Sequence, residues 1–173
     1  MNLIIKSLIL TLFLTRLSFA QDNQQLTSKD IYSKDGLIYK ISNDSIFSGS
    51  IENRRWTNNI LLSKSEYQNG YIILHTQYYN KNKAGIPSKK TYFYEHQYFK
   101  KKKEDKLDFD GSIYSTIYFD ENENKILEEG FSSGKLIYSC EFKDGKKNGK
   151  EFCLSKNGEA FHYVYENGKK NKI

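Results

Sequence analysis

The sequence predicts an all-β fold, an elongated and twisted antiparallel sheet of successive β-hairpins. Three observations favour it. Asn-Gly and Asp-Gly pairs recur along the chain, and they tolerate the positive φ angles that tight hairpin turns require. The segments between them are rich in aromatic residues, with 14 Tyr and 11 Phe among 173 residues, and large rings suit a pleated surface. No amphipathic helical period appears after residue 20, so no helix is expected there.

The C-terminal stretch 136–173 carries the hairpin pattern most clearly. Asp144-Gly145 is followed 23 residues later by Asn167-Gly168, and each pair has an aromatic residue two positions before it and Lys-Lys after it. Asn148-Gly149 and Asn157-Gly158 lie between them, and we expect these pairs to mark corners of the hairpin chain as well. A unit repeated at this interval predicts a stacked array of hairpins.

Two of these segments, Phe142–Phe152 and Tyr165–Lys170, resemble the MORN-repeat variant units of the bacterial YwqK-like antitoxin family. The stretch 35–49 is similar to the opening hairpin of that family, although Ile46 stands where the family has Pro and Ser48 where it has Thr. The likeness is good over the C-terminal quarter and loose at the opening. It implies a MORN-like repeat array, and it raises the hypothesis of an antitoxin.

Residues 1–20 are typical of a secretory signal peptide. Lys6 precedes a short apolar run, and Ser18-Phe19-Ala20 places small residues at the recognition positions for cleavage. The apolar run is shorter than the roughly 20 residues that a permanent membrane span needs. We therefore expect a secreted or periplasmic protein with no permanent membrane span after cleavage. Residues 21–34 are polar and suggest a flexible leader, and 35–173 would form a single repeat domain.

The charge balance argues against a nucleic-acid partner. Without Lys6 and Arg16 of the signal peptide, 25 basic residues face 21 acidic ones, so the net charge is +4 instead of +6. This excess is spread along the chain, whereas nucleic-acid binders concentrate their cations on one face.

The remaining hairpins are predicted from the same kinds of turn residue. The first one is expected over 37–51 around an Asn43-Asp44 turn, with Trp56 covering its apolar face. A strand is expected over 91–99. Further turns are expected at Asn69-Gly70, 80–85, Asp110-Gly111, 120–124 and 130–134.

Two charged clusters are candidate interaction surfaces. Arg54 and Arg55 beside Trp56 could bind an anion, although a solvated strand edge explains them too. The run Lys100, Lys101, Lys102 and Lys103 could make peripheral contact with an anionic membrane or an acidic protein, and a solvated loop over 100–106 is the simpler interpretation.

Cys140 and Cys153 are an even pair in an exported chain, which raises the hypothesis of a disulfide. The outcome depends on register. A hairpin centred between Lys146 and Lys147 would place the two cysteines opposite each other. Matching the apolar faces would instead pair Phe142 with Phe152 and leave both thiols free.

No catalytic pattern is present. The three histidines, His75, His96 and His162, fall on separate expected strands, which does not match the short ligand spacings of zinc sites. No phosphate-binding loop or catalytic triad signature appears. We therefore predict no catalytic residue, no cofactor site and no metal site, and a protein that is not an enzyme.

Three functions remain as hypotheses. The first is an exported interaction module that presents Tyr, Lys and Asn to a protein or envelope component. The second is an antitoxin or immunity-type protein that neutralises a partner toxin, as the family resemblance implies. The third is a structural envelope component that binds glycans through stacked aromatic rings.

Overall fold

The computed structural model describes residues 26–80 and 84–171, and the expected signal peptide lies outside these ranges. The described residues form strands and turns without a helix, which confirms the all-β prediction. It follows that no helix in the described ranges is long and apolar enough to cross a membrane. The strands are β1 (Ile31–Lys34), β2 (Leu37–Lys40), β3 (Gly49–Arg54), β4 (Leu61–Gln68), β5 (Tyr71–Tyr78), β6 (Pro87–Phe93), β7 (Lys101–Leu107), β8 (Ile113–Phe119), β9 (Lys125–Ser132), β10 (Lys135–Lys143), β11 (Lys146–Leu154), β12 (Ala160–Glu166) and β13 (Lys169–Asn171).

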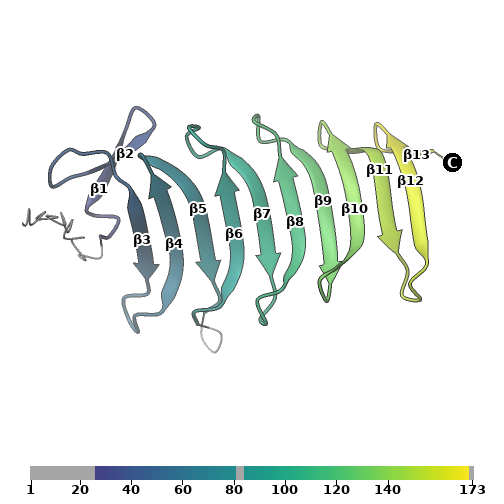
Figure 1. Cartoon of the computed structure of the whole chain (residues 1–173), viewed down its shortest axis with the longest axis horizontal. Coiled ribbons are helices and arrows are strands. Elements are labelled where there is room, and N and C mark those ends of the chain that lie inside the picture. The colour runs from purple at the N-terminus through teal and green to yellow at the C-terminus, as the bar shows by residue number, and fades with distance from the viewer. Residues whose placement is uncertain (1–25, 81–83, 172–173) are drawn as a thin grey trace, which may run out of the picture.

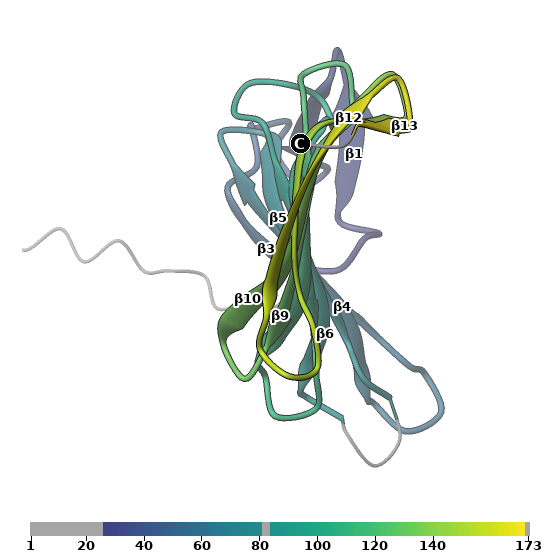
Figure 2. The same cartoon turned by 90° about the vertical axis from the view of Figure 1, so that its right-hand side faces the viewer.

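Strands β3 to β13 form one antiparallel sheet of 11 strands in sequence order (Figure 1). Each strand pairs with the strands before and after it, so every connection is a hairpin and the sheet stays open at both edges. Seen along its length, the sheet is a twisted single layer (Figure 2). The elongated meander expected from the sequence is therefore confirmed.

Several Asn-Gly and Asp-Gly pairs make the two-residue turns that the sequence predicts. Both residues have positive φ at Asp35-Gly36, Asn69-Gly70, Asp144-Gly145 and Asn167-Gly168, and this geometry matches the twist of the flanking strands. Asn148-Gly149 is different, because it lies inside β11. Gly149 forms part of an irregularity where the pairing of β10 with β11 shifts register, so the prediction of a hairpin corner there is wrong.

Three further expectations are corrected. The leader expected over 21–34 becomes a strand at Ile31, because Ile31 packs against the hydrophobic core. The strand expected over 91–99 ends at Phe93. The loop expected over 100–106 is strand β7, which pairs with β6 and β8. Its charged side chains are partnered there, since Glu104 pairs with Lys89 of β6 and Asp105 accepts from Thr116 of β8.

The N-terminal segment covers one end of the sheet. Ile38 of β2, Phe47 just before β3 and Ile51 of β3 form a buried core. Leu26, Ile31 and Tyr67 pack against it. Three backbone hydrogen bonds fix this arrangement: Ile38 N to Gly70 O, Gly70 N to Phe47 O and Phe47 N to Ile38 O, with lengths of 2.8–3.0 Å. Among the residues that the structure describes, the sheet thus gains a second layer where the β1–β2 hairpin packs on the β4–β5 turn, with Leu37 against Gly70.

Farther along, aromatic and lysine side chains shield the single layer. Phe119 is opposite Lys125, and Phe142 is opposite Lys147. Lys125 Nζ lies 3.7 Å from the centroid of the Phe142 ring, and Lys147 Nζ lies 5.0 Å from that of Tyr165. Each lysine also pairs with a glutamate of its own strand, Glu128 or Glu151. The lysine stems cover the rings while their charges are satisfied.

Candidate functional site

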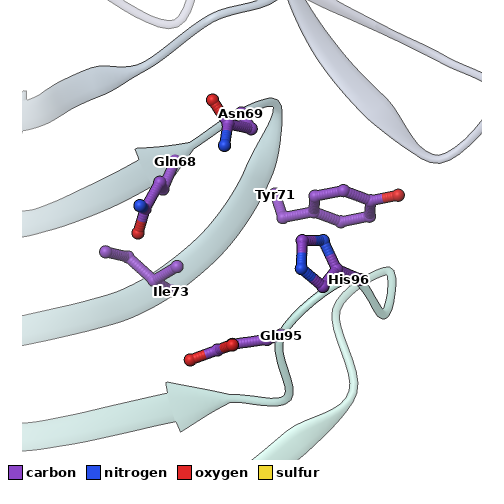
Figure 3. A pocket seen from close by; sticks show the side chains of 6 residues that line it. All are labelled: Gln68, Asn69, Tyr71, Ile73, Glu95 and His96. Carbon is purple, nitrogen blue, oxygen red and sulfur yellow. The ribbon is translucent and has the colours of Figure 1, made fainter.

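Two neighbouring cavities lie on one face of the sheet near the N-terminal end. The first, of about 210 Å³, is lined by Gln68, Asn69, Tyr71, Ile73, Glu95 and His96 (Figure 3). The second, of about 350 Å³, is lined by Gln68, Ile73, Tyr92, Phe93, Glu95, Lys102 and Lys103. Because they share Gln68, Ile73 and Glu95, we treat them as one open groove that crosses β4 to β7, and we call it the Tyr92 groove.

Strand register places the groove residues on one face. Tyr92 is the direct cross-strand partner of Leu74 on one side and of Lys103 on the other, and Gln68 is the partner of Tyr71. Direct partners in an antiparallel sheet point to the same side. The pairing also shifts register near Ile73 and near Lys102. Each shift adds one residue to its strand, and this extra residue lines the groove.

The β6–β7 connection closes one side of the groove. This segment spans 94–100, whereas the β4–β5 connection is the two-residue turn Asn69-Gly70. Tyr94 N donates to Lys100 O at 2.9 Å. His96 and Phe99 have positive φ angles of 58° and 54°, a conformation that costs free energy for residues with a Cβ atom.

Contacts with other elements hold this connection in place. Tyr98 Oη lies 3.0 Å from Ser33 Oγ of β1, and the Tyr98 ring lies against Gly36. The Tyr94 hydroxyl donates to Phe119 O at 2.7 Å. The His96 ring meets the Tyr71 ring edge-on, with a centroid distance of 5.3 Å (Figure 3). The groove wall is therefore positioned by strands on both sides of it.

The other end of the groove is basic and aromatic. Lys103 Nζ lies 4.4 Å from the Tyr92 ring centroid, and Lys102 Nζ lies 5.9 Å from the Tyr94 ring centroid. Lys102 is exposed, and Lys103 is half-buried. Each ring holds one ammonium group above the sheet.

Lys103 is positioned further by a buried carboxylate. Lys103 Nζ lies 2.9 Å from Asp105 Oδ2, and the Asp105 side chain is 1% exposed. The Thr116 hydroxyl donates a 2.9 Å hydrogen bond to the other oxygen, Oδ1. A buried carboxylate is tolerated only when it is paired in this way. The charge of Lys103 is thus partly balanced by Asp105 within the sheet, whereas Lys102 is exposed to solvent.

One hydrogen bond joins residue types that occur in catalytic sites. Ser65 Oγ lies 2.8 Å from His75 Nδ1, as a nucleophile and its base would. Burial, followed by the charge of Lys89, lowers the pKa of His75 and so favours the neutral imidazole. Neither residue lines the Tyr92 groove. The pair serves to satisfy two half-buried polar groups across β4 and β5.

The three histidines do not form a cluster. His75 is half-buried in β5, whereas His96 and His162 are exposed, on the β6–β7 connection and on β12. Within residues 26–80 and 84–171, no three His, Cys, Asp or Glu side chains lie together in a way that could hold a metal ion.

The two charged clusters expected from the sequence lie apart. Arg54 ends β3 and Arg55 and Trp56 follow in the β3–β4 connection, at the opposite ends of the strands from the β6–β7 connection (Figure 1). Trp56 is 94% exposed, so the expectation that it covers the first hairpin is wrong. It extends from the tip of a connection, whereas the apolar face of that hairpin is covered by Tyr67 and Leu26.

Arg54 is already engaged. Its guanidinium pairs with Glu52 at 2.7 Å and donates to Asn59 O at 3.0 Å. Of the lysine run, Lys102 and Lys103 line the groove. Lys101 does not, and its Nζ lies 4.9 Å from the centroid of Phe119. Lys100 ends the β6–β7 connection through its carbonyl.

The two cysteines are free thiols. Cys140 is opposite Glu151, and Cys153 is opposite Tyr138. The two cysteines therefore point to the same face of the sheet but are diagonal neighbours, not direct partners. The irregularity at Gly149 causes this, because it shifts the pairing of β10 with β11 between the turn and Cys140. The predicted pairing of Phe142 with Phe152 is also wrong, since Phe142 is opposite Lys147 and Phe152 is opposite Ser139. Burial is the main cause that raises the pKa of Cys140.

Sequence reasoning missed the half of the groove that holds no lysine, formed by Gln68, Tyr71, Ile73, Glu95 and His96. We call it the lysine-free half. One signal was available. The segment 94–100 lacks the Asn-Gly or Asp-Gly pair that marks the tight turns at Asn69-Gly70 and Asp144-Gly145. A missing turn pair predicts a longer connection, and longer connections commonly carry binding residues.

No known protein family and no curated protein matches the chain. Among solved structures, it is similar to a chain described as "Crystal structure of GtfA/B complex bound to UDP and GlcNAc", with a TM-score of 0.45 and 6% sequence identity. The match covers 59% of this chain and 22% of that chain.

Proposed function

We propose that the protein is an exported, non-catalytic binding module that uses the Tyr92 groove to hold its partner. The observation that carries this proposal is the wall formed by Glu95 and His96, which Tyr98 and Tyr94 fix against β1 and β8. A wall that is ordered before a ligand arrives loses little entropy on binding. The predicted signal peptide at residues 1–20 supports export.

A binding function agrees with the composition of the groove. It offers the rings of Tyr71 and Tyr92 together with amide, carboxylate, imidazole and ammonium groups. Such a mixture suits recognition through apolar contact and hydrogen bonds. The Ser65–His75 pair lies outside the groove, so the proposal gives it no catalytic role.

The test compares two matched double variants of the chain from Gln21 onward. Glu95→Gln with His96→Asn alters exposed groove groups, and Asn tolerates the positive φ at His96. Glu166→Gln with His162→Asn changes the same residue types on β12, where both side chains are exposed. Each protein is immobilised and incubated with the envelope fraction of the source cells.

We expect the wild type and the β12 variant to retain the same component, and the groove variant to lose it. Equal retention by both variants would contradict a role for the groove. Turnover of a substrate that depends on Ser65 and His75 would contradict a non-catalytic function. The antitoxin hypothesis would gain support if the retained component were a toxin.

A further inference from the structure

We propose that the Tyr92 groove binds an acidic carbohydrate, a sugar chain that carries a carboxylate or a phosphate. The inference rests on the proposed binding function and names the chemical class of the ligand. In this arrangement a sugar ring packs against Tyr71, its hydroxyls meet Gln68 and Glu95, and its anionic group lies beside Lys102.

The lysine-free half of the groove matches the two kinds of surface on a sugar. The C–H face of a pyranose ring is apolar and packs on an aromatic ring, while its hydroxyls need planar donors and acceptors. Tyr71 supplies the ring at one end of the first cavity, where it meets His96, and Gln68 and Glu95 extend from the other end (Figure 3).

The basic half of the groove selects for an anionic group on the ligand and sets the orientation in which the ligand binds. Lys102 is exposed and lines the second cavity, whereas the charge of Lys103 is balanced by Asp105. Glu95 lines both cavities, and its carboxylate repels an anion wherever no cation offsets it. An anionic substituent is therefore favoured only at the Lys102 end, where the ammonium group offsets Glu95 and forms a charge-assisted hydrogen bond.

Size and charge argue against a nucleic acid. The second cavity, of about 350 Å³, lies within the range of about 300–1,000 Å³ that small-ligand sites occupy. Glu95 and Asp105 offset the two lysines, whereas nucleic-acid grooves follow the backbone with an excess of cations. A short oligosaccharide with few charges fits this balance.

The probes are matched pairs that share their sugar rings and differ in the anionic group. Trigalacturonate is compared with its methyl ester, which has the same sugar rings without the carboxylates. Glucose 6-phosphate is compared with glucose, and inorganic phosphate serves as the charge without the sugar. Binding to the chain from Gln21 onward is measured by titration calorimetry and by amide chemical shifts. A preference for trigalacturonate over its ester would identify the anion as a carboxylate, and a preference for glucose 6-phosphate over glucose would identify it as a phosphate.

We expect saturable binding of at least one acidic sugar, with about tenfold weaker binding of its neutral partner, and no saturation by inorganic phosphate. Lys102→Gln should remove that tenfold preference. Lys101→Gln is the control, because it removes the same charge from the same strand at a position that does not line the groove. Tyr71→Ala should weaken binding of both members of a pair.

Equal binding of the acidic and neutral sugars, equal effects of Lys102→Gln and Lys101→Gln, or no saturation by any sugar would overturn the inference. If the groove variant of the preceding test still loses its envelope component while no sugar binds, the ligand class is wrong and the binding function stands. If sugars bind while that variant retains its component, the ligand class stands and the envelope partner uses another surface.

Discussion

Asp105 of β7 and Thr116 of β8 are direct cross-strand partners, and the Thr116 hydroxyl donates a 2.9 Å hydrogen bond to Asp105 Oδ1. The carboxylate is 1% exposed and its second oxygen lies 2.9 Å from Lys103 Nζ. This single-layer sheet thus buries the Asp105 carboxylate among the neighbouring side chains on its own face. This cluster links the interior of the sheet to the lysine end of the Tyr92 groove.

Asp105→Ala should lower the free energy of unfolding by about 2–4 kcal/mol, because it leaves the Thr116 hydroxyl and Lys103 without their partner. Asp105→Asn should cost less, since the amide oxygen can still accept from Thr116. Urea denaturation measures both, with Glu121→Ala in an exposed turn as the control. A change below about 0.5 kcal/mol for Asp105→Ala would show that the cluster does not stabilise the sheet.

Gly149→Ala should destabilise the protein more than Gly145→Ala. Both glycines have positive φ, 105° and 74°, so each alanine carries a backbone cost of about 1–2 kcal/mol. At Gly149 a Cβ atom would also meet the carboxylate of Glu141, whose Oε2 accepts from Lys150 N at 2.8 Å. Gly145 has no atom within 4 Å of that position.

Thermal and urea unfolding of the two glycine variants measure the difference. Adding Glu141→Ala to Gly149→Ala should recover part of the loss, because it removes the group that the methyl would displace. An equal loss of unfolding free energy in the two glycine variants would mean that the contact with Glu141 does not add to the destabilisation.

His75 should make stability depend on pH below neutrality. Burial lowers its pKa from 6.5, with a further contribution from Lys89. The unfolded chain therefore binds more protons than the folded chain as the pH falls below about 6.5. The contribution of His75 to stability should be fully present above that pH and be lost as the pH drops toward the lowered folded pKa.

His75→Gln should flatten this part of the pH profile, whereas His162→Gln on the exposed side of β12 should leave it as in the wild type. Urea midpoints between pH 5 and pH 8 provide the measurement. A wild-type slope that survives in His75→Gln would assign the effect to another group.

The two thiols should react at different rates in the folded protein. Cys140 is 1% exposed and its pKa is raised chiefly by burial, so little thiolate is present to react. Cys153 is only half-buried. A thiol reagent should label Cys153 first, and Cys153→Ser should remove the fast phase. Both thiols should react in denaturant without a reductant, and recovery of fewer than two would indicate a disulfide.

Local residue chemistry was enough to predict most turns of this fold. Asp144-Gly145 and Asn167-Gly168 form tight turns because their preference for positive φ acts within four residues. The alternation of aromatic and polar residues then predicts strands on either side. Asn148-Gly149 shows the limit of this reasoning, because the same pair can form an irregularity inside a strand where a glutamate occupies the space beside the glycine.

The sequence by itself determined the chain of successive hairpins, the absence of helix in the described residues and the positions of most tight turns, although it missed strand β7. The tertiary structure decided the register, and with it the free cysteines, the burial of Asp105 and the Tyr92 groove. The groove depends on one extra residue in β5 and another in β7, and on a contact between Tyr98 and Ser33, which lie 65 positions apart. Turn preference is a local property of the backbone. Which side chains meet across strands depends on every shift of register between them, and the packing of the whole sheet sets those shifts.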